Sequence, residues 1–242
     1  MIRRVLNSSA EVALEASLRA ATLIREAIAA RGTARIVAAT GASQQDFLAL
    51  LTTQPGIVWK QVVLFHLDEY LGLPPHHPAS MHRYLRQRII QPAGITEEYL
   101  LDGTNPEACA RAAAALRTAP PDVAFAGIGE NGHLAFNEPP ADFSTEEPFI
   151  VVQLAEQSRR QQVQEGWFRS LEDVPLQAVT MSVRQILNAR AILCIATGTR
   201  KARAVRDCFT GEVGPFAPAS ALRLHLDATV YLDAEAASLL PD

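Results

Sequence analysis

Short, almost wholly apolar segments alternate with longer helical segments along this chain, and that alternation restricts the fold more than any other feature. Apolar runs of this length, bounded by turn residues, are typical of strands that are buried on both faces. The expected strands are residues 35–39, 62–67, 122–128, 178–182, 191–196 and 229–232. The expected helices are residues 9–31, 80–90, 106–117 and 199–209, with a further helix through Phe47, Leu48 and Leu51. The pattern predicts an α/β fold of three layers, in which a largely parallel sheet has helices on both faces.

A single domain accommodates this pattern. The chain has 242 residues, of which 48% are apolar, and this is enough to bury a sizeable core. The sequence contains no internal repeat and no low-complexity linker. We therefore expect residues 1–242 to form one Rossmann-like domain. Its longest helix, residues 9–31, is expected to be capped by Ser9 and ended by Gly32.

Charge and cysteine usage exclude several classes of partner. The net charge is −4 and the isoelectric point is about 5.9, and no basic block alternates with aromatic residues, so nucleic acid is not an expected partner. No apolar run approaches the roughly 18 residues of a membrane span. The three cysteines follow no disulfide or metal spacing, and the N-terminal segment, which we expect to be helical from its start, has no apolar signal region. The chain is therefore expected in the cytoplasm, with no membrane partner.

Four polar clusters follow expected strands, at residues 40–43, 68–70, 129–138 and 197–201. In open parallel sheets, ligands bind outside the carboxyl ends of the strands. The four clusters therefore predict one composite site. Because every strand must end in some loop, the chemistry of each cluster has to decide between a site and ordinary turns.

Two of the clusters join a strand to a helix. The turn Thr40-Gly41-Ala42-Ser43 places unpaired backbone N–H groups and a hydroxyl at a helix N-terminus, which favours an anion such as phosphate. An ordinary turn capped by Ser43 is the alternative. Lys201 falls in the first turn of the later helix, where its charge opposes the helix dipole unless it faces an anion. A solvated surface lysine is the alternative there.

Two adjacent carboxylates, Asp68 and Glu69, end the second expected strand. A partly desolvated carboxylate can remove a carbon-bound proton as a general base. Strand alternation sends the two side chains to opposite sides, so one is expected to face a substrate and the other to serve the structure. The residues alone leave open which of the two faces the substrate, and Glu69 and nearby His82 are counted among the substrate-binding residues. A turn-capping role is the alternative for the acid pair.

The segment GIGENGHLAFNEP, residues 127–139, crowds three glycines, a histidine and a carboxylate into one loop after an expected strand. A histidine oriented by a carboxylate can move protons near neutral pH, so His133 with Glu138 is predicted to be catalytic. The family resemblance given below implies roles for two more residues of this loop, with Asn131 assisting His133 and Gly129 letting the backbone approach a sugar. A structural loop histidine is the alternative. No histidine has metal-ligand spacing, so we expect no metal.

These motifs together resemble the glucosamine-6-phosphate deaminase (isomerase) family, in the right order and over most of the chain. The segments that carry the resemblance are TGAS at 40–43, LDEYLGL at 67–73, HPASMHRYL at 77–85, GIGENGHLAFNEP at 127–139, AVTMSVRQILNARAILCIATGTRKA at 178–202 and PASALRLH at 218–225. The acid motif and the His-Asn-Glu-Pro motif are specific to it. The related sugar-phosphate lactonases share the fold and the phosphate loop but lack the Asn-Glu-Pro ending.

The resemblance implies a substrate and a mechanism. A 2-amino-2-deoxy hexose 6-phosphate binds as a closed ring, and His133, oriented by Glu138, moves protons between O1 and O5 to open it. Asp68 then takes the C2 proton and returns it at C1 through an enolamine, which yields a ketose 6-phosphate and ammonia. The phosphate is expected on Gly41, Ala42 and Ser43, with Lys201. No cofactor is implied, because the sugar carbonyl and the leaving amine carry the chemistry.

The chain departs from the family pattern in several places. Asn131 stands where members carry Asp or Asn, and as an amide it can orient groups but hold no charge. Gln44 follows the phosphate turn where the family usually has Pro. The family places an arginine on the phosphate from the region after Asn-Glu-Pro, and Arg159 and Arg160 are the candidates here. The longer C-terminal part of allosteric relatives has no counterpart, so an equivalent effector site is not expected.

Alternative functions remain open from the sequence. Segments such as PASALRLH also resemble the galactosamine-6-phosphate isomerase branch, so the product is either fructose 6-phosphate or tagatose 6-phosphate. A 6-phosphogluconolactonase-type hydrolase would share His133 but needs no base at C2. A non-catalytic sugar-phosphate sensor would need only the phosphate turn. Whether the chain forms a homo-oligomer is also left open.

Overall fold

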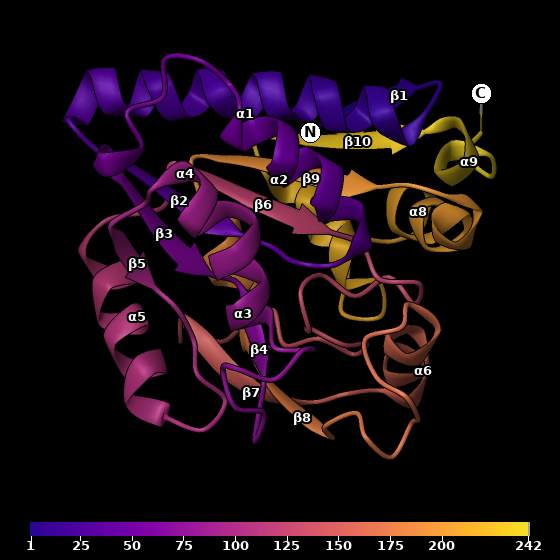
Figure 1. Ribbon diagram of the computed structural model, residues 1–242. Coiled ribbons are helices and arrows are strands. Elements are labelled where there is room, and N and C mark those ends of the chain that lie inside the picture. Colours follow the sequence, from indigo (N-terminus) through magenta and orange to yellow (C-terminus); the bar gives the residue numbers. More distant parts are fainter. Residues whose placement is uncertain (242) are drawn as a thin grey trace.

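Seven parallel strands form the central sheet of the computed structural model, which describes residues 1–241 (Figure 1). In order across the sheet these are β1 (Ile2–Leu6), β10 (Ala228–Asp233), β9 (Ala191–Ala196), β6 (Val123–Gly127), β2 (Ala34–Ala38), β3 (Val62–His66) and β5 (Glu97–Tyr99). The chain builds outward from the middle, through β2, β3 and β5 to one edge and through β6, β9 and β10 towards the other. The boundary between β2 and β6 is therefore a switch point of the topology, where open parallel sheets bind ligands.

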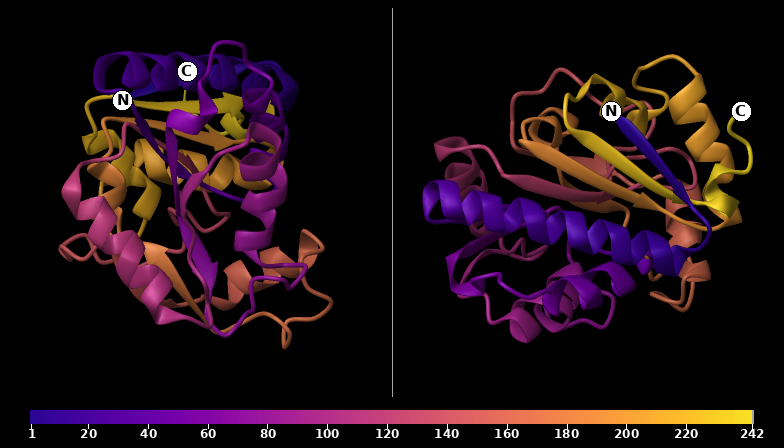
Figure 2. Two further views of the ribbon diagram at one scale, coloured as in Figure 1. Left: turned by 60° about the vertical axis from the view of Figure 1, so that its left-hand side comes forward. Right: turned by 90° about the horizontal axis from the view of Figure 1, so that it is seen from above.

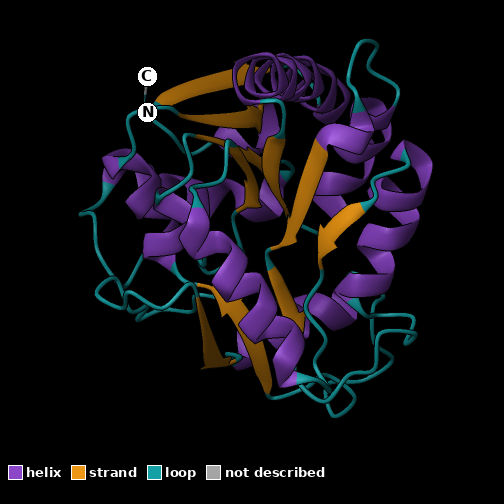
Figure 3. Cartoon of the chain, turned by 90° about the vertical axis from the view of Figure 1, so that its left-hand side faces the viewer, coloured by secondary structure: helices purple, strands orange, loops and turns teal. Residues whose placement is uncertain are grey.

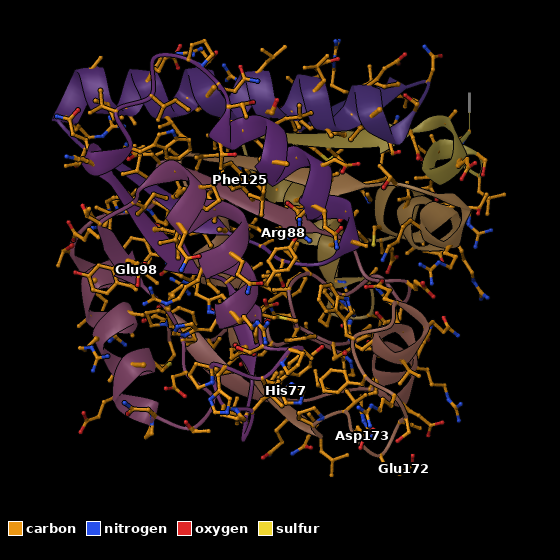
Figure 4. All side chains as sticks on the ribbon, viewed as in Figure 1. His77, Arg88, Glu98, Phe125, Glu172 and Asp173 are labelled. Carbon is orange, nitrogen blue, oxygen red and sulfur yellow. The ribbon has the colours of Figure 1, made fainter. Side chains whose placement is uncertain are left out.

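Helices cover both faces of this sheet because successive strand residues point to opposite sides. Ile36 and Phe125 pack in one core with α1 (Ser9–Arg31) and α2 (Gln45–Thr52). Figure 4 shows Phe125 below α1. The centroids of the Phe125 and Phe47 rings lie 4.9 Å apart in an edge-to-face arrangement. The intervening strand residues form a second core with α5 (Pro106–Thr118) and α8 (Ala202–Thr210). The predicted three-layer α/β fold is confirmed.

The long helix α1 spans the predicted residues and lies across the strands when seen from above (Figure 2). Its buried face is mostly alanine, which allows a helix to approach a sheet closely. Gly32 ends it in the left-handed conformation, with φ 76° and its N–H bonded to the Ile28 carbonyl. The capping residue is Ser8 rather than Ser9, because the Ser8 hydroxyl accepts from the Glu11 N–H and Ser9 is already helical.

The remaining helices are short. They are α3 (Met81–Leu85), α4 (Gln91–Ala93), α6 (Glu156–Gln164), α7 (Val183–Leu187) and α9 (Ala234–Ala237). Single helical turns occur at η1 (Ala42–Gln44), η2 (Trp59–Gln61), η3 (Arg86–Ile90), η4 (Thr199–Lys201) and η5 (Pro218–Leu224). The helix predicted over residues 80–90 is thus α3 continued by η3, which has π-helical bonding. Within residues 1–241, no helix has the length and apolar character needed to cross a membrane.

A second, antiparallel sheet lies below the central one (Figures 1 and 3). It consists of β4 (Asp68–Tyr70), β8 (Gln177–Met181) and β7 (Phe149–Gln153). Leu67 joins the two sheets, because its N–H bonds the Ala38 carbonyl of β2 and its own carbonyl accepts from Met181 of β8. The chain therefore leaves the central sheet at the residue before Asp68. The strand predicted at 178–182 exists, but it belongs to this smaller sheet.

The N-terminal segment is a strand, which corrects the expectation that it is helical from its start. Residues Ile2–Leu6 form β1, an edge strand that pairs in parallel with β10. Four of its five residues are exposed, and two arginines interrupt the apolar residues, so the segment lacks the continuous apolar run that marks the inner strands. Its conformation is set by backbone pairing with a strand more than two hundred residues away, which the sequence pattern does not report.

Candidate active site

One cavity of about 270 Å³ lies at the carboxyl ends of β2, β3, β6 and β9, four neighbouring strands at the switch point. Figure 1 shows α6 and α8 on the side to which these strands run. Residues from all four predicted clusters line the cavity. They are Thr40, Gly41, Ala42, Ser43, Asp68, Gly129, His133 and Lys201. The parallel sheet thus brings into one wall groups that are up to 161 residues apart in sequence.

Asp68 lies in this cavity with only 6% of its surface exposed. Among residues 1–241, no hydrogen bond or ion pair joins its carboxyl group, so the group is free to meet a ligand. Burial raises the pKa of Asp68 to about 8, and the neighbouring Glu69 charge adds to the shift. A carboxyl group with this pKa changes its protonation state close to neutral pH, as a general base requires.

Glu69 points away from the cavity and does not line it, which corrects its assignment as a substrate contact. Its carboxylate is buried and accepts from the Ser80 hydroxyl at 2.8 Å and from the His82 N–H at 2.8 Å. It also accepts from the N–H groups of Tyr70 and Met81. Glu69 therefore anchors the start of α3 to β4. Asp68 faces the cavity and Glu69 faces away from it, as the alternation of side chains along a strand predicts.

His82 does not line the cavity either, so the structure does not support its assignment as a substrate contact. Its Nδ1 lies 3.0 Å from the Leu101 carbonyl, and its Nε2 accepts from Arg86. Both ring nitrogens are thus engaged with neighbouring protein groups. The residue lies on α3 but on the side that faces the loop after β5.

His133 faces the cavity and belongs to a buried polar network behind it. Its Nδ1 lies 3.1 Å from the Ser158 hydroxyl oxygen and 3.5 Å from Oε2 of Glu138. Asn131 donates from Nδ2 to Glu138 at 2.7 Å, and its Oδ1 accepts from the backbone N–H of His133. Asn131 and Glu138 do not line the cavity themselves. Both act on the cavity through His133.

The pKa of Glu138 is lowered, so this carboxylate stays ionised near neutral pH. Burial by itself would raise it, but hydrogen bonds and the charge of His133, with further hydrogen bonds from Ser158 and Asn131, outweigh burial. An ionised carboxylate can only accept hydrogen bonds. Glu138 can therefore hold the imidazole ring and the Asn131 amide in fixed orientations.

Gly129 is a glycine because the His133 ring occupies the space of a side chain. A Cβ at this position would lie 2.2 Å from Cε1 and 2.3 Å from Nε2 of His133. The backbone of the loop also closes here, since the Gly129 N–H bonds the His133 carbonyl at 3.0 Å. Sequence reasoning attributed this glycine to the approach of a ligand. The structure shows that it admits the histidine ring.

The turn at residues 40–43 is open to an anion. Gly41 has φ 101°, a conformation that favours glycine, and it precedes the 3₁₀ turn η1. The first bond of that turn is made by Gln44, so the N–H groups of Ala42 and Ser43 precede it and have no intrahelical acceptor. The hydroxyl of Tyr84 donates to the Gly41 carbonyl at 3.2 Å and holds the turn in place.

The second strand-to-helix turn, at residues 197–201, differs from the first. Its Gly198 N–H already bonds both carboxylate oxygens of Asp233 at 3.0 Å, and the Thr199 N–H bonds Glu235 at 3.2 Å. Internal carboxylates thus occupy two of the backbone donors that the sequence suggested for an anion. The side chains of Arg200 and Lys201 also belong to this turn and line the cavity.

Arg200 and Lys201 bring positive charge to the cavity. Burial lowers the pKa of Lys201, and the Arg200 guanidinium lowers it further, whereas Glu165 and Glu130 oppose the shift. Arg200 lies 3.3 Å from Glu130 in an ion pair that leaves its side chain 54% exposed. Sequence reasoning named Lys201 but missed Arg200, although it is the preceding residue of the same motif.

Neither arginine candidate from α6 reaches the cavity. Arg159 donates to the Leu171 carbonyl, and Arg160 pairs with Glu156 on the exposed side of the helix. The face of α6 that meets the site instead carries Ser158 and the cavity-lining Gln161 and Gln162. Sequence reasoning missed this face, because a polar helix has no apolar periodicity to reveal which side is buried.

A resident metal has no obvious set of ligands in the part of the chain that the structure describes. Within residues 1–241, no group of three or more His, Cys, Asp or Glu side chains is placed to hold a metal ion.

Comparisons with known proteins agree in pointing to one family. The model of a family described as glucosamine-6-phosphate isomerases/6-phosphogluconolactonase matches residues 7–231. A glucosamine-6-phosphate deaminase of Listeria monocytogenes serotype 4b is 36% identical over 232 residues, which cover 94% of this chain and 96% of that protein. A glucosamine-6-phosphate deaminase of Exiguobacterium sibiricum is 39% identical over 186 residues, covering 76% and 72% of the two chains.

Two solved structures show the same fold. The structure of a monomeric glucosamine-6-phosphate deaminase matches with a TM-score of 0.91 at 31% identity, covering 99% of this chain and all (100%) of that one. A 6-phosphogluconolactonase from Shewanella baltica matches with a TM-score of 0.79 at 20% identity, covering 97% and 98%. At that identity the second match shows a shared fold and nothing more.

Proposed function

Because the chain belongs to the family of glucosamine-6-phosphate isomerases and 6-phosphogluconolactonases, we propose that it converts glucosamine 6-phosphate to fructose 6-phosphate and ammonia. The observation that carries this proposal is the Asp68 carboxyl group, buried and unpaired among the described residues, in the same cavity as His133. Relatives that are 36% and 39% identical bear the name glucosamine-6-phosphate deaminase, which supports the same conclusion.

Ring opening is the first step of the proposed reaction. A neutral or charged imidazole can move a proton between O5 and O1 of the closed sugar. His133 lines the cavity, and Glu138 and Asn131 hold its ring and its backbone from behind. The Asn131 amide orients the carboxylate of Glu138 without adding a charge of its own.

Proton transfer from C2 to C1 is the second step. Asp68 takes the C2 proton from the open-chain sugar, which forms an enolamine, and returns the proton at C1. One water molecule then hydrolyses the resulting imine at C2, which gives the ketone and releases ammonia. Burial raises the pKa of the carboxyl group, which strengthens its basicity towards a carbon acid. The sugar carbonyl and the amine supply the remaining chemistry, so we propose no cofactor.

The phosphate binds at the edge of the cavity in this proposal. The free N–H groups of Ala42 and Ser43 and the Ser43 hydroxyl lie on one side, and the cations of Arg200 and Lys201 lie on the other. Arg200 takes the place of the arginine that the family brings from the region after Asn-Glu-Pro. We propose that the whole chain, residues 1–242, acts as one catalytic domain on this substrate.

Replacing Lys201 tests the phosphate subsite. Lys201→Ala should raise KM by roughly 10-fold to 100-fold, the usual value of a hydrogen bond to a charged group, and should lower kcat much less. A phosphate remote from C2 contributes binding that is the same in the ground state and the transition state. The measurement is steady-state kinetics with glucosamine 6-phosphate and with glucosamine.

The chain offers a matched control, because its only other lysine, Lys60, is exposed and does not line the cavity. Lys60→Ala should leave both constants unchanged. Equal losses for the phosphorylated and the unphosphorylated sugar in Lys201→Ala would place this lysine away from the phosphate.

Replacing Gly129 tests the fit of the histidine ring. In Gly129→Ala the new methyl group would overlap the imidazole, so His133 has to move, and kcat should fall on the order of 10²-fold. Gly214→Ala is the control, because a Cβ there meets open space and the backbone is unstrained. Thermal unfolding of both variants shows whether the fold survives. A kcat for Gly129→Ala equal to that of the control would mean that the ring position does not limit turnover.

The alternatives need fewer of these groups. A lactonase has no use for a base at C2, and a non-catalytic sensor has no use for either Asp68 or His133. Neither explains a buried carboxyl group that lines the cavity without a partner among the described residues. The solved lactonase structure, at 20% identity, supports a shared fold and no shared activity.

One assay tests the proposed function directly. The protein is incubated with glucosamine 6-phosphate, galactosamine 6-phosphate and 6-phosphogluconolactone in parallel, and ammonia, ketose phosphate and acid release are measured. We expect ammonia and fructose 6-phosphate from the first. Ammonia from the galactosamine compound alone would reassign the sugar, and hydrolysis of the lactone alone would overturn the proposal.

A further inference from the structure

Ser158, in the first turns of α6, has the closest contact to Nδ1 of His133 that the network contains. Its hydroxyl oxygen lies 3.1 Å from this nitrogen, whereas Oε2 of Glu138 lies 3.5 Å from it. The same hydroxyl accepts from Nδ2 of Asn131 at 3.3 Å. Ser158 is 2% exposed and does not line the cavity, so it acts on the site only through these neighbours.

The direction of each hydrogen bond follows from counting donors and acceptors. The Asn131 amide is fixed, because its Oδ1 accepts from the His133 N–H, so Nδ2 can only donate to Ser158. A hydroxyl has one proton and two lone pairs. One lone pair receives the Asn131 amide, which leaves one lone pair and the proton for His133 and Glu138.

The carboxylate of Glu138 decides between the two remaining arrangements. If Nδ1 of His133 carried a lone pair, it would face Oε2 at 3.5 Å, and two acceptors would repel each other. Placing the proton on Nδ1 removes the repulsion and lets the ring donate to Ser158. The Ser158 hydroxyl then keeps its own proton, which can turn towards the ionised Glu138.

We propose that Ser158 is a positioning residue whose hydroxyl accepts from Nδ1–H of His133 and turns its own proton towards Glu138, and that this relay, together with the charge of Glu138, fixes the tautomer of the ring. The opposite edge of the imidazole, with Cε1 and Nε2, lies over Gly129 at the cavity. The neutral ring thus presents the lone pair of Nε2 to a ligand. The catalytic consequence, a base aimed at the sugar oxygens, rests on the proposed function, whereas the tautomer itself does not.

Helix α6 connects this relay to the wall of the cavity. Ser158, Gln161 and Gln162 are spaced three and four residues apart, so they share the buried face of the helix. Gln161 accepts from the backbone N–H of Glu130, which fixes the helix to the loop that carries His133. A change in α6 therefore reaches the imidazole through Ser158.

The first experiment reads the tautomer in the free protein. Nitrogen-15 NMR of the histidine rings should show His133 of the wild type with its proton on Nδ1, and Ser158→Ala should populate the Nε2–H form or a mixture. Ser158→Thr retains a hydroxyl and should keep the wild-type pattern. Unchanged His133 signals in Ser158→Ala, in a protein that unfolds at the normal temperature, would overturn the relay.

The second experiment reads the consequence for turnover of glucosamine 6-phosphate. Ser158→Ala should lower kcat by roughly 10-fold to 100-fold, the usual cost of losing a partner that orients a histidine, with KM within about twofold. Ser158→Thr should recover most of kcat. Ser17→Ala, which removes another buried serine whose hydroxyl donates within α1, should leave kcat unchanged.

The two experiments separate the relay from the proposed function. A changed tautomer together with a normal kcat supports the relay and counts against the ring-opening role of His133. A lowered kcat with an unchanged tautomer overturns the relay. If Ser158→Ala does not fold, the NMR pattern and kcat of Ser158→Thr carry the test. This variant keeps a hydroxyl, so finding the His133 proton on Nε2 instead of Nδ1 would contradict the proposal.

Discussion

Asp68→Asn should lower kcat by roughly 10² to 10⁴, the usual value of a positioned general base, while substrate binding changes little. The substitution keeps the size of the side chain and removes its ability to accept a proton from carbon. The carboxyl group of Asp68 is buried in the cavity without an internal partner among the described residues, so the substitution breaks no hydrogen bond of the fold. The measurement is steady-state kinetics together with incorporation of solvent deuterium at C1 of the product.

The pH dependence gives this prediction a second observable. Burial and the charge of Glu69 raise the pKa of Asp68 to about 8, so the ionised base becomes more abundant as pH rises through that value. Because kcat/KM reports the free enzyme, it should fall on the acid side of about pH 8 in the wild type. The residual rate of Asp68→Asn should lack this limb. Asp227→Asn, at a half-buried residue that does not line the cavity, should keep both the rate and the limb. Deuterium that still entered C1 at the wild-type rate in Asp68→Asn would show that Asp68 is not the base.

The stability of the folded protein should change with pH in the opposite sense to kcat/KM. A carboxyl group whose pKa is raised from 3.8 to about 8 on folding binds more protons in the folded state, so it destabilises the protein progressively as pH rises across that window. Asn carries no charge and avoids this loss. The gain in Tm of Asp68→Asn over the wild type should therefore grow from about pH 4 to about pH 8 and then level off. A Tm difference that is independent of pH would contradict the raised pKa.

His133→Gln should slow the reaction of the closed sugar by roughly 10² to 10⁴ and largely spare the C2 exchange of a ring-opened substrate. Glutamine can still form hydrogen bonds but cannot move a proton. The imidazole is held at the cavity from behind by Ser158 and Glu138, so its role depends on its own protonation and not on a change of position. The measurement compares closed and open-chain substrates over a range of pH.

An exposed histidine provides the control for this variant. His76→Gln, in the loop before α3, should leave both rates unchanged because His76 does not line the cavity. The ratio of the two rates matters more than either rate alone. If His133→Gln slowed both forms of the substrate equally, the histidine would serve the architecture of the site or the chemistry at C2, and its assignment to ring opening would be wrong.

The acid pair shows how far local sequence rules reach. Alternation along a strand requires Asp68 and Glu69 to point to opposite sides, and they do, with Asp68 in the cavity and Glu69 at the start of α3. The rule could not say which of the two side chains would face the cavity. That depended on Leu67, which joins β2 of the central sheet to β8 of the smaller one and so sets the side on which the strand meets the cavity.

The two strand-to-helix turns show the limit of motif reading. They look alike in sequence, each with a glycine of positive φ before a short helical turn. The turn at residues 40–43 keeps the N–H groups of Ala42 and Ser43 free, whereas Asp233 and Glu235 occupy the N–H groups of Gly198 and Thr199 in the other turn. Asp233 ends β10 and Glu235 follows it, so their contact with the turn after β9 exists only once the two strands are paired.

The sequence by itself determined the elements whose cause is local. Apolar runs specified the inner strands, a glycine in the left-handed conformation ended α1, and the turns after β2, β3, β6 and β9 carried the groups of the site. Tertiary structure alone decided the rest. It formed β1 as an edge strand, separated the smaller sheet and brought Ser158 of α6 to the ring of His133. The physical reason is that polar side chains and exposed strands gain their partners from distant backbone and side chains, and no local pattern records which partner the fold will bring.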